Sequence, residues 1–388
     1  MSNNALHGQG TRGVLVREAG QKLHGRKILV TGGCGFIGSA LVRHLVAVCG
    51  ARVLNVDALT YAGDPSVVAA VAHLSNYEFE QLNICDTARL SEAVRRFEPD
   101  AIIHLAAESH VDRSIDRPAD FIQTNILGTY ALLETAVTYF RSLGGDKRDQ
   151  FRFLHISTDE VYGALDHSGA RFTEASQMRP NSPYAASKAA SDHLVRAWGV
   201  TYNLPVIISN CSNNFGPFQY PEKMIPTMIL SALHGLPLPV YGTGENVRDW
   251  LFVDDHVAAL VLLLAAGRPG ETYLIGGGAE ICNIDLVRKL CSVLDELRPG
   301  CRHENLISFV ADRPGHDLRY AVDSSKIRTE LGWRPRESFA SGLEKTVHWY
   351  LTNDSWWKKR LNGGQIGERL GLSANGERAA PSMRVGHG

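Results

Sequence analysis

The sequence has no feature that would place the chain in a membrane or on nucleic acid. Its longest apolar run, Val257 to Ala266, is too short to cross a bilayer, and the chain does not open on the apolar core of a secretory signal. The 40 Lys and Arg side chains nearly balance the 41 Asp and Glu, and a net charge of −1 attracts neither nucleic acid nor an anionic membrane. We therefore expect a cytoplasmic protein with no membrane partner and no nucleic-acid partner.

Cysteine is scarce and scattered. The seven cysteines are odd in number and form no C-x-x-C pair, which disfavours both a zinc site and a disulfide framework and indicates a reducing compartment. We predict no metal site. The apolar fraction of 44% and the charged fraction of 21% are those of an ordinary globular protein, and 388 residues suit one large domain or two modest ones.

Strand-like and helix-like stretches alternate from Lys27 to Asn210. The strand-like runs are Lys27–Thr31, Arg52–Val56, Tyr77–Leu82, Asp100–Leu105, Phe151–Ser157 and Pro205–Asn210, and the helical stretches are Phe36–Val48, Ala88–Phe97, Phe121–Phe140 and Pro183–Tyr202. Alternation of this kind, with almost continuously apolar strands, predicts a parallel sheet covered by helices on both faces. We therefore predict an α/β fold, with a doubly wound, Rossmann-type domain at residues 27–210.

The pattern changes after Asn210. Longer loops rich in Pro, Gly and charge separate short strands from helices predicted at Lys223–His234, Asp254–Ala266 and Asn283–Leu297. Residues 211–355 are predicted to form mainly a smaller α/β substrate domain, with some return crossings to the first domain. Residues 1–26 are expected to be a flexible N-terminal extension. Residues 356–388 are expected to be a C-terminal tail that is weakly ordered from about Leu361.

A glycine-rich turn follows the first predicted strand. Gly32 permits a tight turn, Gly35 lets the backbone approach a pyrophosphate, and Gly38 lets the next helix pack closely on the strand. The helix N-terminus offers N–H groups to phosphates. Glycines can also mark a plain turn, but their position between a strand and an amphipathic helix favours a dinucleotide site.

Asp57 ends the second predicted strand, where a ribose-binding acid is expected. A carboxylate accepts hydrogen bonds from the ribose hydroxyls and repels a 2′-phosphate, so it predicts NAD over NADP. The alternative is an aspartate that only opens a loop. The ends of the third and fourth strands, Asn83-Ile84 and Leu105-Ala106-Ala107, are expected along the same crevice.

Tyr184 and Lys188 lie four residues apart at the start of a long predicted helix, so they share one face. A free tyrosine has a pKa of about 10 and is a poor base near neutral pH. A nearby ammonium and the positive charge of a nicotinamide would stabilise the phenolate. The pair therefore predicts a general base that takes a proton from an alcohol during hydride transfer, although an ordinary surface helix can carry the same spacing.

The predicted strand before that helix ends in Thr158-Asp159-Glu160. Thr158 can donate a hydrogen bond to the oxygen being oxidised. Two adjacent carboxyl groups exceed what hydride transfer needs, whereas elimination of water needs an acid and a base. The alternative is a turn capped by Asp159, with Glu160 in solvent.

With these residues, the chain resembles the dTDP-glucose 4,6-dehydratases of the extended short-chain dehydrogenase/reductase family from about Lys27 to about Leu351. The motifs that carry the resemblance are Thr31–Gly38, Asn55–Gly63, His104–Ile115, His155–Gly163, Asn210–Pro217, Arg248–Trp250 and Ala311–Asp317. The resemblance implies that Tyr184 takes the C4 hydroxyl proton of dTDP-glucose while NAD accepts the C4 hydride. It further implies that Glu160 removes the C5 proton, that Asp159 protonates the departing C6 hydroxyl, and that NADH returns its hydride to C6.

The resemblance also implies two sets of contacts. NAD contacts are expected at Phe36, Ile37, Asp57, Ala58, Leu59, Thr60, Asn83, Ile84, Leu105, Ala106, Ala107, Thr124, Tyr184, Lys188 and Asn214. Substrate contacts are expected at Ser109, Thr158, Asn213, Lys223, Met224, Pro239, Tyr241, Arg248, Arg313 and His316. Ala279 stands where the family commonly has Asn, which leaves the choice between dTDP and UDP open.

Two other functions stay open at this stage. One is a 4-epimerase or decarboxylase that acts on a UDP-sugar, and the acid pair disfavours the epimerase. The other is a non-catalytic, NAD-binding regulatory protein, which the complete set of catalytic residues disfavours. Relatives further imply a homodimer through the predicted helices Ile122–Arg141 and Pro183–Tyr202.

Overall fold

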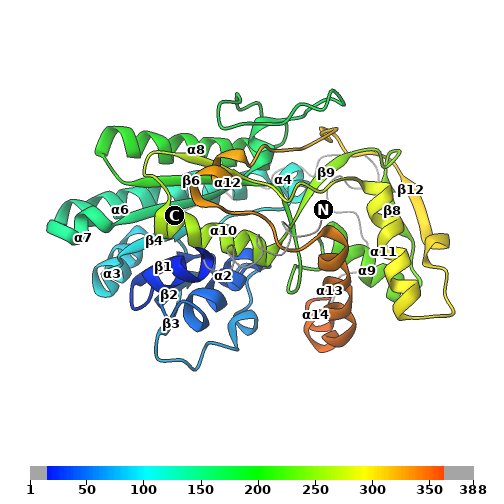
Figure 1. The fold of residues 1–388 in the computed structure, drawn as a ribbon, viewed down its shortest axis with the longest axis horizontal. Helices are drawn as coiled ribbons and strands as arrows, with labels where there is room; N and C mark the ends of the chain where they lie inside the picture. Colours follow the sequence, from blue (N-terminus) through cyan, green and yellow to red (C-terminus); the bar gives the residue numbers. More distant parts are fainter. Residues whose placement is uncertain (1–14, 362–388) are drawn as a thin grey trace, which may run out of the picture.

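The computed structural model describes residues 15–361. Figure 1 shows two lobes, with a sheet flanked by helices on the left and a smaller lobe containing α9, α11, β8 and β12 on the right. The outer parts of the predicted extension and tail, residues 1–14 and 362–388, lie outside the described residues. None of the helices within residues 15–361 is long and apolar enough to span a membrane.

The first lobe is a seven-stranded parallel sheet in the order β10-β6-β5-β4-β1-β2-β3. Its strands are β1 (Lys27–Thr31), β2 (Arg52–Asp57), β3 (Tyr77–Gln81), β4 (Ala101–His104), β5 (Arg152–Thr158), β6 (Val206–Cys211) and β10 (Thr272–Ile275). The helices that accompany it are α2 (Phe36–Ala47), α3 (Thr87–Phe97), α4 (Val111–Asp116), α5 (Pro118–Phe121), α6 (Thr129–Ser142), α7 (Gly145–Gln150), α8 (Pro183–Tyr202), α10 (Val253–Ala266) and α12 (Ser325–Leu331). The predicted doubly wound α/β fold is confirmed.

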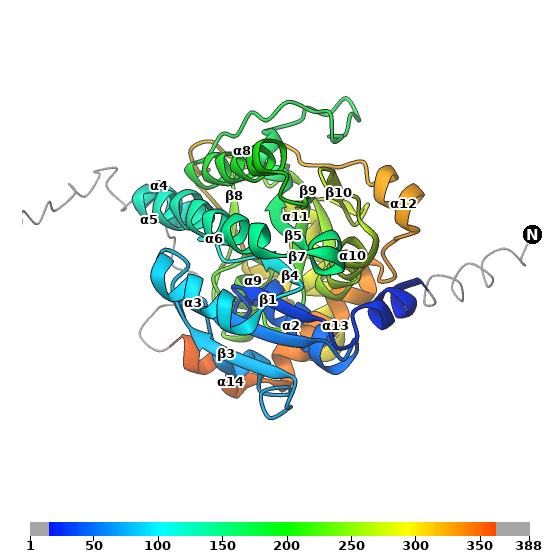
Figure 2. The same cartoon turned by 90° about the vertical axis from the view of Figure 1, so that its left-hand side faces the viewer.

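The apolar strands face helices on both sides, because successive strand residues point to opposite faces. In β1, Ile28 and Val30 join a core that includes residues of α2 and α10. Leu29, between them, joins a second core that includes residues of α3, α6 and α8. The view of Figure 2 shows α6 and α8 on one side of the strands and α2 on the other.

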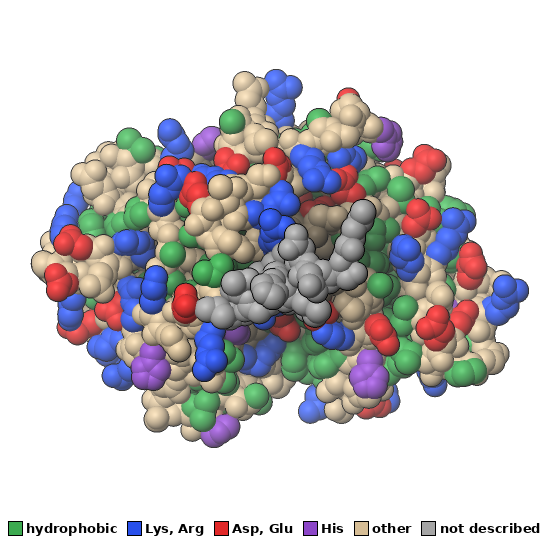
Figure 3. Space-filling model, viewed as in Figure 1, with side chains coloured by type: hydrophobic (Ala, Val, Ile, Leu, Met, Phe, Trp, Pro, Cys, Tyr) green, Lys and Arg blue, Asp and Glu red, His purple; other side chains and the backbone are tan. Residues whose placement is uncertain are grey.

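The second lobe has its own core. Its three-stranded sheet has the order β11-β9-β7 and its two-stranded sheet pairs β12 with β8. The elements are β7 (Asn213–Phe215), α9 (Met224–Leu233), β8 (Leu238–Tyr241), β9 (Val247–Phe252), β11 (Glu280–Cys282), α11 (Asn283–Leu297), β12 (Ile307–Val310), α13 (Phe339–Thr352) and α14 (Asp354–Arg360). On the face shown in Figure 3, basic and acidic side chains are interspersed, in keeping with the balanced charge of the sequence.

Parts of the predicted N-terminal extension and of the predicted C-terminal tail are folded into the protein. Residues 15–22 are helical, and Ala19 and Leu23 are buried in the core that contains α2, so the prediction of a flexible extension is wrong for residues 15–26. The predicted start of the tail at residue 356 falls inside α14, whose Trp357 is buried in the second core. The helix predicted at Phe121–Phe140 contains a π-helical segment, Ile122–Gly128, before α6.

Candidate active site

One large pocket lies where the parallel strands end, as expected for a doubly wound sheet. The turns after β1, β3 and β4 and the last residues of β2, β5 and β6 all contribute to its wall. The second lobe contributes two residues of β7, five residues between positions 218 and 223, and two residues of α14. The pocket is therefore enclosed by both lobes.

The glycine-rich turn forms a close-fitting cradle. Gly32 has a φ of +74°, and a Cβ there would lie 2.6 Å from the Ala106 nitrogen. A Cβ at Gly38 would lie 2.1 Å from the Gly32 oxygen. Gly35 differs, because its added Cβ would meet only the Gly32 oxygen, at 3.3 Å, among the described residues. Gly35 also begins α2 without a side-chain cap, so the N–H groups of the first turn face the pocket and suit a pyrophosphate.

Asp57 is fixed at the end of β2 by the backbone around it. Its Oδ2 accepts from the Cys34 N–H at 2.9 Å and its Oδ1 from the Leu59 N–H at 2.8 Å. Burial raises the pKa of the carboxyl group, while these two hydrogen bonds lower it. Each oxygen keeps a lone pair for a further donor such as a ribose hydroxyl. The cradle and the carboxylate together fit the adenosine diphosphate half of NAD.

Nearly all the predicted cofactor residues line this pocket. The lining members are Gly32, Gly35, Phe36, Ile37, Gly38, Asp57, Ala58, Thr60, Asn83, Ile84, Leu105, Ala106, Ala107, Thr124, Tyr184, Lys188 and Asn214. Leu59 does not line it. Leu59 has a φ of 53° and contributes its N–H to Asp57 instead.

Tyr184 and Lys188 occupy the first two turns of α8, whose N-terminus is fixed by a side-chain cap and a proline. The Ser182 hydroxyl accepts from the Ala185 N–H at 3.0 Å, and Pro183 opens the helix. Lys188 is buried and donates to the Ile156 carbonyl at 2.9 Å. Burial raises the pKa of the Tyr184 phenol well above its usual value, so ionisation of Tyr184 depends on positive charge brought close to it.

Thr158, Asp159 and Glu160 lie at the end of β5 and in the 3₁₀ turn Asp159–Tyr162 that follows it. The Thr158 hydroxyl accepts from the Glu160 N–H at 3.2 Å and donates to Asp159 Oδ1 at 3.3 Å. Thr158, rather than Asp159, therefore caps the turn, and Glu160 is partly buried rather than solvated. The alternative of an Asp159 cap is wrong.

The two carboxyl groups have different surroundings. Burial raises the pKa of Asp159 well above its usual value, and the charge of Glu160 adds to that effect. Burial also raises the pKa of Glu160, but Arg313, Arg248 and Lys223 oppose the rise. Of the two, Asp159 is therefore the group more strongly favoured in its protonated form, and such a difference allows an acid and a base to work side by side.

The predicted substrate residues fall into two groups. Ser109, Thr158, Asn213 and Lys223 line the pocket, whereas Met224, Pro239, Tyr241, Arg248, Arg313 and His316 do not. The structure places several of the second group on β8, on β9 and in the 312–317 loop. Arg248 donates to the Asp317 carbonyl at 2.9 Å and Arg313 to Asp112 Oδ1 at 3.1 Å. Their positive charges still act on Glu160.

Sequence reasoning missed a contribution of α14 to the pocket. Trp356 and Arg360 line it beside Asp64, with which Arg360 forms an ion pair. The Arg360 guanidinium also lies 3.7 Å from the centre of the Trp356 ring, and the Trp356 ring packs edge-on against Phe218 at 5.7 Å. The only sequence signal was the Trp356-Trp357 pair, since large aromatic residues are rare in weakly ordered tails.

It also missed a bridge between the lobes at the pocket wall. Arg113 pairs with Glu222 at 2.9 Å and stacks over Tyr61 with its guanidinium 3.9 Å from the ring centre. Lys223 donates to the Ser109 carbonyl at 2.7 Å. Tyr61 and Glu222 both line the pocket, so these contacts join the two lobes at the wall of their shared pocket.

Comparison with known proteins agrees with this geometry. The family model described as GDP-mannose 4,6 dehydratase matches residues 29–346. A probable dTDP-glucose 4,6-dehydratase of Sinorhizobium fredii is 57% identical over 347 residues, which cover 89% of this chain and 99% of the relative. A dTDP-glucose 4,6-dehydratase of Neisseria meningitidis is also 57% identical, with the same coverage of each chain.

Solved structures give the same result. The dTDP-glucose 4,6-dehydratase DesIV of Streptomyces venezuelae, with NAD and TYD bound, is 47% identical with a TM-score of 0.78, over 86% of this chain and 99% of that one. A UDP-glucose 4-epimerase of Thermus thermophilus in complex with NAD is only 29% identical, with a TM-score of 0.73, over 84% of this chain and 99% of that one. The resemblance seen in the sequence is confirmed, and the chain belongs to the family of nucleotide-sugar 4,6-dehydratases.

Proposed function

We propose that the chain is a dTDP-glucose 4,6-dehydratase that binds NAD and converts dTDP-glucose to dTDP-4-keto-6-deoxyglucose and water. The observation that carries the proposal is the Asp159–Glu160 pair, which lines the same pocket as Tyr184 and Lys188. A neighbouring carboxyl group adds to the rise in the pKa of Asp159, whereas basic side chains oppose the rise in the pKa of Glu160. Relatives of more than 50% identity carry the name of this activity. The NAD-bound and TYD-bound relative supports both the cofactor and the thymidine nucleotide.

The first step is oxidation at C4. When bound, NAD accepts a hydride and later returns it. Tyr184 takes the proton of the C4 hydroxyl, and Thr158 donates a hydrogen bond to the same oxygen. Because burial and the nearby carboxyl groups oppose ionisation of Tyr184, its function depends on the ammonium of Lys188 and on the positive charge of the oxidised nicotinamide.

The second step is elimination of water. A ketone at C4 makes the C5 proton acidic, and Glu160 removes that proton. Asp159, favoured in its protonated form by burial, donates a proton to the departing C6 hydroxyl. Reduction at C6 and reprotonation at C5 complete the reaction, so no net NADH is formed and no added reductant is needed.

The test is a panel of dTDP-, UDP- and GDP-linked glucose and mannose, read by the mass of the product. dTDP-glucose should lose one water without accumulation of NADH. A product of unchanged mass would indicate an epimerase. If no sugar nucleotide were turned over, the result would favour a non-catalytic regulatory protein. Glu160→Gln should slow release of water by about 10²–10⁴-fold while still allowing the first oxidation, seen as enzyme-bound NADH at 340 nm.

We also propose that the chain forms a homodimer through α6 with its preceding π-helical segment and α8. Ile122, Leu127 and Tyr130 on the first and Val200 on the second are exposed, and a packed interface would bury them. Sedimentation of the purified protein should give twice the mass of the chain. Leu127→Lys should shift it to the monomer, whereas Phe309→Lys, at an exposed apolar residue on β12, should leave it unchanged.

A further inference from the structure

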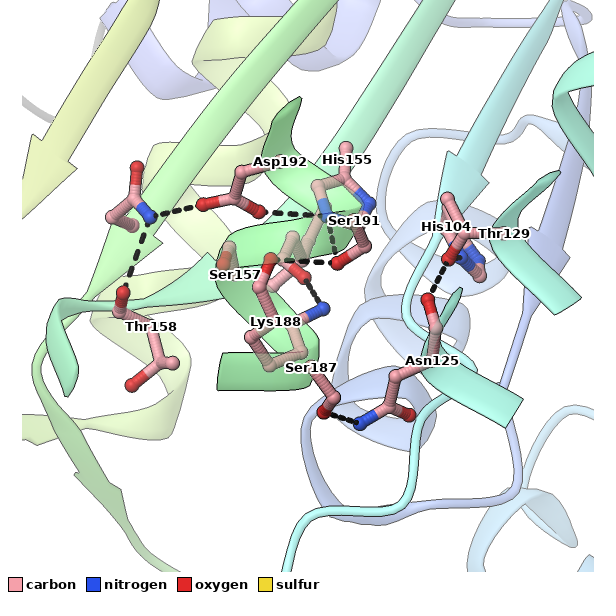
Figure 4. Close-up of polar contacts among 12 residues, drawn as sticks. His104, Asn125, Thr129, His155, Ser157, Thr158, Ser187, Lys188, Ser191 and Asp192 are labelled. Atoms are coloured by element: carbon pink, nitrogen blue, oxygen red, sulfur yellow. Dashed lines mark hydrogen bonds and ion pairs between the residues drawn. The ribbon is translucent and has the colours of Figure 1, made fainter. Parts of the chain in front are cut away.

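A buried polar cluster lies behind Lys188, outside the pocket wall. Its centre is Asp192, which stands on α8 one helical turn after Lys188 and is 1% exposed. His155 of β5 is fully buried beside it. Figure 4 shows Asp192 and His155 pointing toward one another. Neither side chain lines the pocket, and the reaction steps above use neither of them.

The hydrogen bonds of Asp192 come from neutral groups. Its Oδ1 lies 3.0 Å from His155 Nε2, and its Oδ2 accepts from Asn210 Nδ2 at 2.8 Å. Burial and the charge of Lys188 push the pKa of His155 well below its usual value, so the ring donates as a neutral imidazole. A buried carboxylate needs a positive partner to offset the loss of hydration, and Lys188 is the cation on the same helix face.

Lys188 depends on Asp192 in return. Burial lowers the pKa of the Lys188 ammonium, and Asp192 is the first of two groups that raise it. Its hydrogen bond to the Ile156 carbonyl brings only a partial charge. The titratable groups that interact electrostatically with Lys188 are Asp192 on its own helix, Cys211 on β6, His155 on β5 and His104 on β4. Tyr184 precedes Lys188 by four residues on α8. The two histidines are neutral, and burial raises the thiol pKa of Cys211 to about 12.

Asn210 extends the cluster to the other half of the catalytic machinery. The same Nδ2 group that donates to Asp192 also donates to the Thr158 carbonyl at 3.1 Å. Thr158 is the last residue of β5 and is followed by Asp159 and Glu160. One carboxylate thus fixes the amide that holds the end of β5.

We propose that Asp192 is a positioning residue with two tasks: it is the buried counter-ion that keeps Lys188 charged, and through Asn210 it anchors the strand end that carries Thr158, Asp159 and Glu160. The proposal rests on the proposed function, in which the Lys188 ammonium stabilises the Tyr184 phenolate. The pKa of Asp192 is raised to about 6, so its carboxylate is charged throughout the range from pH 7 to 9.

The test is the pH profile of kcat/KM for Asp192→Asn. The amide keeps the shape and can accept from Asn210, but it removes the negative charge. Lys188 then loses its proton at lower pH, so the alkaline limb of the profile should move down by about one pH unit, the lower end of the effect of a nearby opposite charge. Glu92→Gln is the matched control, because it makes the same change from carboxylate to amide at an exposed position on α3 and should leave the limb in place.

Two further variants separate the tasks. Asn210→Ser removes the tether to Thr158 but keeps the counter-ion, so it should lower kcat at every pH without moving the alkaline limb. Asp192→Ser replaces Asp192→Asn if the amide variant does not fold, as judged by circular dichroism. An alkaline limb that stays at its wild-type position in the folded Asp192 variant would overturn the proposal. Wild-type turnover of dTDP-glucose tests the proposed function separately, since this comparison is made between active proteins.

Discussion

Gly38→Ala should destabilise the fold, whereas Gly35→Ala should weaken NAD binding, although both changes add one methyl group to the phosphate cradle. At Gly38 the new Cβ would lie 2.1 Å from the Gly32 oxygen and 2.9 Å from the Gly33 Cα, against an ordinary contact of about 3.4 Å or more. Both neighbours are backbone, so α2 itself must move away from β1. Overpacking of this kind costs about 1–3 kcal/mol, and we expect Gly38→Ala to lie at the upper end.

Gly35→Ala should leave the fold almost unchanged. Gly35 has a φ of −81°, which alanine adopts readily, and its Cβ would meet only the Gly32 oxygen at 3.3 Å among the described residues. The free energy of unfolding should therefore stay within about 1 kcal/mol of wild type. The methyl group would instead occupy the place where the pyrophosphate meets the backbone. Loss of one charge-assisted hydrogen bond, about 1.5–3 kcal/mol, weakens NAD binding by about 10–100-fold.

The assay combines urea unfolding of NAD-free protein with calorimetric titration of NAD. Gly38→Ala should lower the unfolding midpoint, and Gly35→Ala should keep the midpoint and lose affinity. If Gly35→Ala bound NAD as tightly as wild type, the cradle would not hold the pyrophosphate. If Gly38→Ala were as stable as wild type, the packing argument itself would be wrong.

Three other predictions follow from the pocket and its surroundings. Asp57→Asn should weaken NAD binding by about 10–100-fold and reduce the preference for NAD over NADP, as measured by titration with each cofactor; an unchanged preference would contradict the role of the carboxylate. Arg360→Ala removes the ion pair with the Asp64 loop and should speed NAD release several-fold in a stopped-flow chase, whereas Lys359→Ala, on the exposed side of α14, should not. Burial raises the pKa of Asp249 to about 6, so the carboxyl favours the folded state below its unfolded pKa of about 3.8, and this contribution is lost as the pH rises through 6. Asp249→Asn should therefore be more stable than wild type by up to about 3 kcal/mol at pH 7.5 and nearly equal to it at pH 4 in urea titrations, and a gain of the same size at both pH values would contradict this reasoning.

The first lobe was predictable because its signals are local. Every strand predicted between Lys27 and Asn210 is present, with bounds within one residue, since buried parallel strands appear as short apolar runs between glycines and polar turns. The carboxyl ends of such strands must meet at one edge. The short motifs at Gly32, Asp57, Thr158 and Tyr184 could therefore be assigned to one pocket from their positions in the chain.

The second lobe was less predictable because its signals depend on contacts between distant segments. Arg248 and Arg313 are still predicted to contact the substrate, and the structure shows them bonded to backbone carbonyls and to Asp112, outside the residues that line the pocket. The Trp356-Trp357 pair was the only signal for α14, and its place at the pocket depends on contacts with the distant residues Phe218 and Asp64. Helical residues 15–22 were missed for the same reason, since their order depends on packing against distant segments, as with Ala19 and Leu23 in the first core.

The return of β10 to the first sheet has a consequence for how the chain folds and can be divided. β10 pairs with β6, yet Thr272 lies about 60 residues after Cys211 in the chain, and β7, β8 and β9 of the second lobe come between them. A fragment ending near residue 210 would leave the apolar edge of β6 unpaired and would also lack α10, which supplies part of the core beneath the sheet. The second lobe is therefore not an insertion that can be removed to leave a folded first lobe. The chain should melt in a single calorimetric transition, and a protease cut between the lobes should release no independently folded nucleotide-binding piece.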